Sequence, residues 1–148
     1  MLSGYLAGVS TLASFLTLPD ELLYRRPEPD SWSAAEIIHH LADAELVNSM
    51  AFRRIIAEDE PMLRSWDEAE YCRALDYSRR PLLHAIGTIT ALRHANVELL
   101  AELSDEQWVR TGIHAVEGRM DLRSVVAEAS AHLDEHLSQA RSAVNGLS

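Results

Sequence analysis

The chain has 148 residues, of which 47% are hydrophobic and 24% charged, so it is neither disordered nor fibrous and has the size of one globular domain, residues 1–148. Its 13 Lys and Arg against 23 Asp and Glu give a formal net charge of -10. Because this charge repels phosphate backbones and anionic lipid, neither nucleic acid nor a membrane is expected as a partner. The single cysteine, Cys72, cannot form an internal disulfide, so we expect it to be structural and the protein to be cytoplasmic.

The first 18 residues carry no charged side chain, which on its own would suggest a signal peptide or a membrane span. The stretch lacks a basic beginning and a small-residue cleavage site, and serine, threonine and glycine interrupt its apolar run. Its apolar residues recur instead at helical spacing, as at Leu2, Leu6, Val9, Ala13 and Leu16. We therefore predict that residues 1–18 form a helix of a bundle.

A capping pattern at residues 33–36 predicts the start of a second helix. Three prolines between residues 19 and 29 predict a loop after the first helix, since proline cannot continue a helical hydrogen-bond pattern. Ser33 then stands three residues before Glu36, the spacing of a capping box, in which each side chain binds the other residue's backbone N–H. The pattern predicts a long helix that ends before Pro61.

The next segment, residues 61–76, mixes aromatic and charged side chains and is typical of a connector with room for one short helix. Ser78 can cap a third helix that tolerates Pro81 in its first turn. Apolar residues at helical spacing carry this third helix to about Leu103.

A fourth helix follows a second long connector, residues 104–118. Asp121 can cap it, it runs from Leu122 toward Asn145, and Gly146 predicts its end. No stretch alternates apolar and polar residues convincingly, and no short turn signal joins two strands. The expected fold is therefore all-α, an up-down four-helix bundle.

The seven histidines separate on a helical wheel. His40 lies at the edge of the apolar stripe of the second helix and faces the bundle, whereas His39 points nearly the opposite way and is expected in water. His132 and His136 continue the apolar side of the fourth helix, one turn apart, so their rings can converge on one ion. Three histidines stay unassigned: His84, His94 and His114.

From the residues alone, two explanations fit the inward histidines equally. They hold a metal ion, which requires neutral imidazole, or they are buried rings that bond carbonyls or carboxylates. Three neighbours have similar alternatives. Asn48, on the inward face of the second helix, lines a pocket or bonds across the core, while Asp43 and Glu135 orient an imidazole or stay solvated.

Several segments resemble one known family, the DinB-like (YfiT-like) four-helix-bundle proteins. Residues 32–45 are similar to its W-S-x-x-E-x-x-x-H-L-x-D-x-E signature, and residues 61–71 resemble its connector. Residues 114–118 are similar to its H-x-x-x-G loop, and residues 132–139 to its closing H-x-x-x-H-x-x-Q helix. The resemblance implies a DinB-like bundle with a divalent metal ion, variously zinc, nickel or iron, held by His40, His132 and His136 with positions open to water and substrate.

The resemblance also implies a class of chemistry. Family members include transferases that join low-molecular-weight thiols to electrophiles, a thiol-dependent isomerase and proteins named as metal-dependent hydrolases. We therefore expect a low-molecular-weight-thiol S-transferase or a hydrolase that acts on a small molecule. A homodimer is a possible assembly. The alternative is a non-catalytic metal-binding or stress-response bundle protein.

Overall fold

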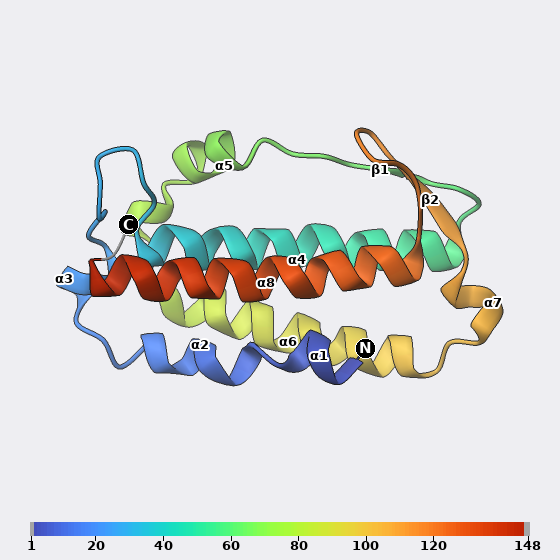
Figure 1. Cartoon of the computed structure of the whole chain (residues 1–148), viewed down its shortest axis with the longest axis horizontal. Helices are drawn as coiled ribbons and strands as arrows, with labels where there is room; N and C mark the ends of the chain where they lie inside the picture. Colours follow the sequence, from blue (N-terminus) through green and yellow to red (C-terminus); the bar gives the residue numbers. More distant parts are fainter. Residues whose placement is uncertain (1, 147–148) are drawn as a thin grey trace.

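The computed structural model describes residues 2–146, so Met1 of the predicted first helix lies outside the described residues. Four helical layers form the molecule, and a small sheet closes one end (Figure 1). The helices are α1 (Leu2–Leu6), α2 (Val9–Phe15), α3 (Asp20–Leu23), α4 (Ala34–Ala57), α5 (Glu68–Ala74), the 3₁₀ helix η1 (Tyr77–Arg79), α6 (Leu82–Ala101), α7 (Asp105–Trp108) and α8 (Leu122–Asn145). The strands are β1 (Met62–Leu63), β2 (Thr111–His114) and β3 (Gly118–Asp121).

The predicted four-helix bundle is present, but its order is not simply up-down. Helices α4 and α6 run in the same direction (Figure 1), as their contacts show: Glu45 of α4 binds Arg93 of α6, and Ser49, one turn later, binds Asn96. The reason is the connector between them, which returns along the whole length of the bundle before α6 begins. Such long crossovers let consecutive helices lie parallel.

The first layer is interrupted where one continuous helix was predicted. α1 ends at Leu6 and α2 begins at Val9, and between them, at Gly8, the chain passes very close to α8. A Cβ atom at Gly8 would lie 2.7 Å from side-chain carbons of both Leu133 and Leu137. The close approach explains a glycine at this position. The predicted loop after α2 also contains the short helix α3.

The predicted signals at the ends of α4 and α8 are confirmed. Ser33 and Glu36 form the capping box of α4, Asp121 caps α8, and Gly146 ends α8 in the left-handed conformation with φ 70°. The predicted start of α6 is wrong. Ser78 lies in η1, and Pro81 precedes the first helical residue rather than standing in the first turn.

The three short strands were not predicted. β1 pairs with β2 in parallel, and β2 pairs with β3 antiparallel. Strands of two and four residues are too short to show a period of two, and β1 reaches its partner across some fifty residues of chain. The sheet fastens the long crossover to the end of the bundle where α4 stops and α8 starts (Figure 1).

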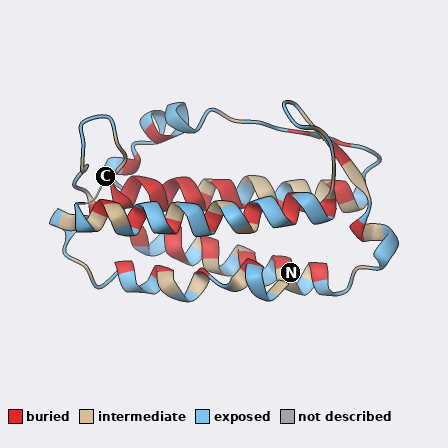
Figure 2. Cartoon of the chain, in the orientation of Figure 1, coloured by how far each residue is buried: buried red, intermediate tan, exposed pale blue. Residues whose placement is uncertain are grey.

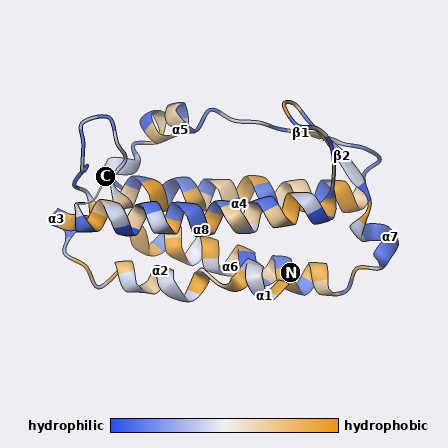
Figure 3. Cartoon of the chain, viewed as in Figure 1, coloured by the Kyte–Doolittle hydropathy of each residue, from blue (hydrophilic) through white to orange (hydrophobic). Residues whose placement is uncertain are grey.

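The bundle interior is apolar, and the outward positions of α8 are hydrophilic and exposed (Figures 2 and 3). Burial differs between helices, because α4 is covered by α6, α8 and the crossover, so almost every residue of its first half is buried. This packing places α4 at the centre of the molecule (Figure 2). Within residues 2–146, no helix is long and apolar enough to cross a membrane.

A charged cluster interrupts this apolar interior. Arg93, of α6, is 1% exposed and contacts the three other layers of the bundle. Its guanidinium donates to Glu45 of α4 over 2.7 Å, to the carbonyl oxygen of Ala129 in α8 over 2.6 Å, and to the carbonyl oxygen of Tyr5 in α1. Asn96 extends the cluster, since its amide donates to the Tyr5 hydroxyl and to Ser49.

Candidate metal centre

The inner wall of the site is the antiparallel pair α4 and α8. This pairing brings His40 of α4 opposite His132 and His136 of α8, although His40 and His132 are 92 positions apart in sequence. The Nε2 atoms of His40 and His132 are 3.2 Å apart, and one ring nitrogen from each of the three histidines lies within 4.8 Å of the other two. The structure therefore brings together the three residues named from the sequence.

The environment keeps two of these rings neutral. Burial, with a further contribution from the other two histidines, lowers the pKa of His40 to about 3. Burial and the neighbouring His136 lower the pKa of His132 to about 4. Glu68 lies 3.9 Å from His40 Nε2, but the contact is no ion pair, since the ring is uncharged at neutral pH. Neutral imidazole is the form that binds metal.

A hydrogen bond to Gln139 determines which nitrogen of the third ring, His136, carries the proton. Nδ1 of His136 is 2.7 Å from Oε1 of Gln139, an amide oxygen that can only accept a hydrogen bond. Nδ1 therefore carries the proton and Nε2 offers its lone pair. Outer hydrogen bonds of this kind orient histidines that bind metals. The donor set of the chain thus suits a divalent ion.

Two tryptophans enclose His40. The Trp32 ring lies 5.2 Å from it, and the Trp66 ring stacks on it at 5.3 Å with an angle of 12° between the planes. Trp32 packs against the hydrophobic core as well as against this ring. Nδ1 of His40 is buried with no hydrogen-bond partner among the residues that the structure describes. The two nitrogens of this ring therefore differ: Nε2 faces His132, whereas Nδ1 has no polar partner.

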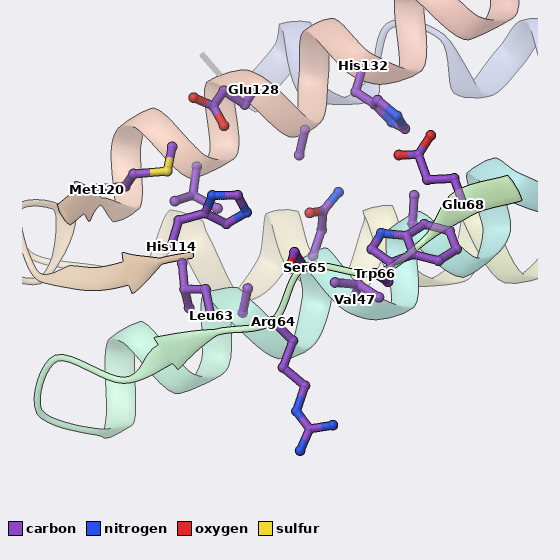
Figure 4. A pocket seen from close by; sticks show the side chains of 15 residues that line it. Val47, Leu63, Arg64, Ser65, Trp66, Glu68, His114, Met120, Glu128 and His132 are labelled. Atoms are coloured by element: carbon purple, nitrogen blue, oxygen red, sulfur yellow. The ribbon is translucent and has the colours of Figure 1, made fainter. Parts of the chain in front are cut away.

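A pocket of about 350 Å³ opens beside the histidines. It lies between α4, α8 and the crossover, and Figure 4 shows His132 and Glu68 facing each other across one end of it. His114, from β2, lies toward the other end (Figure 4). The pocket is therefore large enough for a small molecule that contacts His132, the member of the three-histidine group that lines it.

Other predicted residues have different outcomes. Asn48 lines the pocket, whereas Asp43 accepts a hydrogen bond from the Tyr77 hydroxyl and Glu135 is exposed. His39 was expected in water, and this is wrong: it is 4% exposed, because η1 covers that side of α4. Its Nε2 lies 2.9 Å from the Arg80 carbonyl oxygen, and its ring stacks on Tyr77.

The remaining predicted residues lie away from the site. His84 and His94 are exposed on α6, as their position off the apolar stripe indicated. Cys72 is buried with its Sγ 3.7 Å from Glu36 Oε1, and burial raises the pKa of this thiol to about 11, which suits a structural cysteine.

Three contributors to the site were missed by sequence reasoning: Trp66, Glu68 and Gln139. Asp67 caps α5 by accepting the N–H of Glu70, and this cap spacing is a signal that could have placed Glu68 at the start of a helix. Gln139, three residues after His136, lies on the same helix face, and this spacing could have identified it as a hydrogen-bond partner of His136. Nothing local indicated that Trp66 would reach His40.

A helical bundle in which two facing helices bring three imidazoles together beside an open pocket belongs to the class of bundles with a candidate metal centre. The family model described as the DinB superfamily matches residues 7–140. The chain therefore belongs to the DinB superfamily, and the predicted DinB-like fold is confirmed.

Individual relatives agree with this assignment. A protein of Oceanobacillus iheyensis is 24% identical over 132 residues, which cover 89% of this chain and 76% of that protein. One from Halalkalibacterium halodurans is 26% identical over 126 residues, which cover 84% of this chain and 73% of that protein. Both have the name of a putative metal-dependent hydrolase. These names and the three-histidine group support a divalent metal ion whose identity stays open.

One solved structure has the same fold. YfiT from Bacillus subtilis superimposes with a TM-score of 0.86 over 99% of this chain and 85% of that chain, at 20% sequence identity. That protein is described as a probable metal-dependent hydrolase with an unusual four-helix bundle topology. In the present chain α4 and α6 are parallel, so its topology also differs from a simple up-down bundle.

Proposed function

We propose that this chain is a metal-dependent enzyme that acts on a small molecule, with His40, His132 and His136 as the ligands of a zinc, nickel or iron ion. The observation that carries the proposal is the convergence of three ring nitrogens within 4.8 Å beside an open pocket. Within residues 2–146, no fourth histidine, cysteine or carboxylate joins this group. Three protein ligands and a free position are typical of catalytic rather than structural sites.

The chemistry follows from this arrangement. When bound, a divalent ion acts as a Lewis acid and supplies a water or thiol nucleophile at neutral pH. Glu68, whose carboxylate is partly exposed at the pocket and close to His40, is placed to accept the proton that the nucleophile loses. Trp32 and Trp66 keep water away from the far side of the His40 ring.

The nucleophile decides between two reactions. If it is water, the enzyme is a hydrolase, as the names of the relatives suggest for those proteins. If it is a low-molecular-weight thiol, the enzyme is an S-transferase that joins the thiol to an electrophilic carbon. The same residues serve both reactions.

Metal content provides the first test. Protein purified without an affinity tag should contain about one divalent ion per chain, and His132→Ala should lose it. His94→Ala is the matched control, since His94 is exposed on α6, and it should keep the ion. A protein that takes up no ion after resupply, or a His132→Ala variant with full metal content, would contradict the proposed ligands.

Activity provides the second test. Low-molecular-weight thiols with monochlorobimane would reveal S-transfer, and simple esters would reveal hydrolysis. His40→Ala should abolish either activity, whereas Glu68→Gln should lower kcat while metal content stays at one ion per chain. Metal-loaded protein that is inactive in both assays, or equally active with and without His40, would favour a non-catalytic bundle.

A further inference from the structure

Two polar side chains line the pocket without contributing to the three-histidine group. Asn48, of α4, and His114, at the end of β2, are both half-buried in its wall. Among residues 2–146, no hydrogen bond involves the Asn48 amide, and those of His114 involve only Nδ1, so the amide and Nε2 can bond to a molecule in the pocket. Their free hydrogen-bonding capacity is directed to whatever fills the pocket.

The turn between β2 and β3 fixes the His114 ring. Nδ1 of His114 accepts the backbone N–H groups of Val116 and Glu117, at 3.4 and 3.2 Å. A neutral ring that accepts at Nδ1 carries its proton on Nε2. The turn is closed by the pairing of His114 with Gly118, whose φ of 75° favours glycine. His114 therefore presents one oriented N–H donor, and its ring projects into the pocket (Figure 4).

The charges around the pocket indicate what this donor binds. Two carboxylates, Glu68 and Glu128, lie in the wall, and Arg64 extends away from the pocket (Figure 4). A carboxylate of a ligand would be repelled by these two acidic groups, whereas an uncharged group would not. Asn48 can both donate and accept, and His114 donates, so together they match an uncharged amide, which has a carbonyl oxygen and an N–H.

We propose that Asn48 and His114, which line the same pocket, bind an uncharged amide group of the substrate. The inference rests on the proposed function, because it places the reacting end of the same molecule at the three histidines. The substrate class is thus an amide-bearing small molecule rather than a free acid or a simple alkyl compound. Asn48 and His114 determine specificity and take no part in the reaction.

Alkyl hydroxamates of increasing chain length, each ending in an amide, a carboxylate or a methyl group, are suitable probes, because the hydroxamate end binds catalytic metal ions. Calorimetric titration of the zinc-loaded protein measures their dissociation constants without any turnover. At the chain length that spans the pocket, the amide series should bind more tightly than the carboxylate series. In the parent protein the amide series should also bind more tightly than the methyl series. The ratio of the two dissociation constants should fall about three- to tenfold in Asn48→Leu and in His114→Phe.

Two further variants separate hydrogen bonding from packing. His114→Gln keeps a side-chain donor and should retain more of the amide preference than His114→Phe. His94→Phe, on the exposed face of α6, should leave all dissociation constants unchanged. Metal content and the far-ultraviolet circular dichroism of every variant should match those of the parent protein.

Each outcome has a separate meaning. Equal binding of the amide and methyl series at every length, or an amide preference that survives both Asn48→Leu and His114→Phe, would overturn this inference and leave the metal centre intact. Tighter binding of the carboxylate series would do the same. If the protein holds no zinc, or if no hydroxamate binds the zinc-loaded protein, the proposed function fails, and this inference fails with it.

Discussion

Single side chains set the chemistry of the three imidazoles in different ways. Burial holds His40 and His132 neutral, so both rings are ready to bind a metal ion at neutral pH. For His136, one hydrogen bond, from its Nδ1 to Gln139, decides which nitrogen is left free. Gln139 itself is exposed, so a substitution there tests this hydrogen bond without opening the apolar core.

The first prediction concerns Gln139. Replacement by leucine removes the acceptor that holds the His136 proton on Nδ1, so metal affinity should fall about tenfold, the lower end of the effect of such outer partners. Competition with a chromophoric chelator measures the change. Gln139→Glu keeps an acceptor and should bind at least as tightly as the parent protein. Equal affinities in Gln139→Leu and the parent would show that the hydrogen bond does not orient the ring.

At the scale of the elements, the Arg93 cluster connects α1, α4, α6 and α8. A buried charge is costly unless it is fully paired, and here Glu45 and two backbone carbonyl oxygens surround the guanidinium. One of these oxygens belongs to Ala129, one turn before His132. The cluster therefore fixes the position of α8 relative to α4 near the candidate metal centre.

The second prediction concerns this cluster. Arg93→Met leaves the Glu45 carboxylate buried without its partner, so the free energy of unfolding should fall by about 3–5 kcal/mol. The double variant Arg93→Met with Glu45→Leu removes both charges and should regain a large part of this loss. Urea unfolding of the parent and both variants measures the differences. A loss below about 1 kcal/mol in the single variant would show that the pair contributes little.

For the whole molecule, burial of neutral histidines makes stability depend on pH. The pKa of His40 is about 3 and that of His132 about 4 in the folded protein, and burial also lowers the pKa of His39. All three return to about 6.5 on unfolding. Between about pH 4 and 6.5 the unfolded chain therefore binds protons that the folded chain does not.

The third prediction follows from this difference. In the presence of a chelator, the free energy of unfolding should be fully retained above about pH 6.5 and should decrease as the pH falls toward 4. Each proton taken up on unfolding contributes a slope of at most about 1.4 kcal/mol per pH unit. Urea midpoints across this range provide the measurement. His40→Leu should show a shallower slope and exposed His84→Gln the parental one; identical slopes in all three proteins would contradict the prediction.

Much of the bundle was predictable because its signals are local. The Ser33–Glu36 capping box and the Asp121 cap act within one turn of the chain, and each marks a helix start that the structure confirms. His132 and His136 are four residues apart on one helix, so their convergence follows from the helical repeat alone. That His40 meets them depended on the same inward-facing pattern and on the family resemblance.

The rest depends on which segments cover which faces. A helical wheel places His39 in water, but the crossover and η1 lie over that side of α4 and bury the ring. The same crossover carries Trp66 and Glu68 to the site and makes α6 parallel to α4. Its path is held by β1, whose two residues pair with a strand about fifty positions later.

By itself, therefore, the amino-acid sequence determined the ends of α4 and α8 that carry caps and the pairing of two histidines on one helix, because caps and the helical repeat operate over a few residues. Only the tertiary structure decided the direction of α6, the burial of His39 and the walls of the pocket. These features arise from contacts between distant segments, and the free energy of packing that selects them is not recorded in any single stretch of the chain.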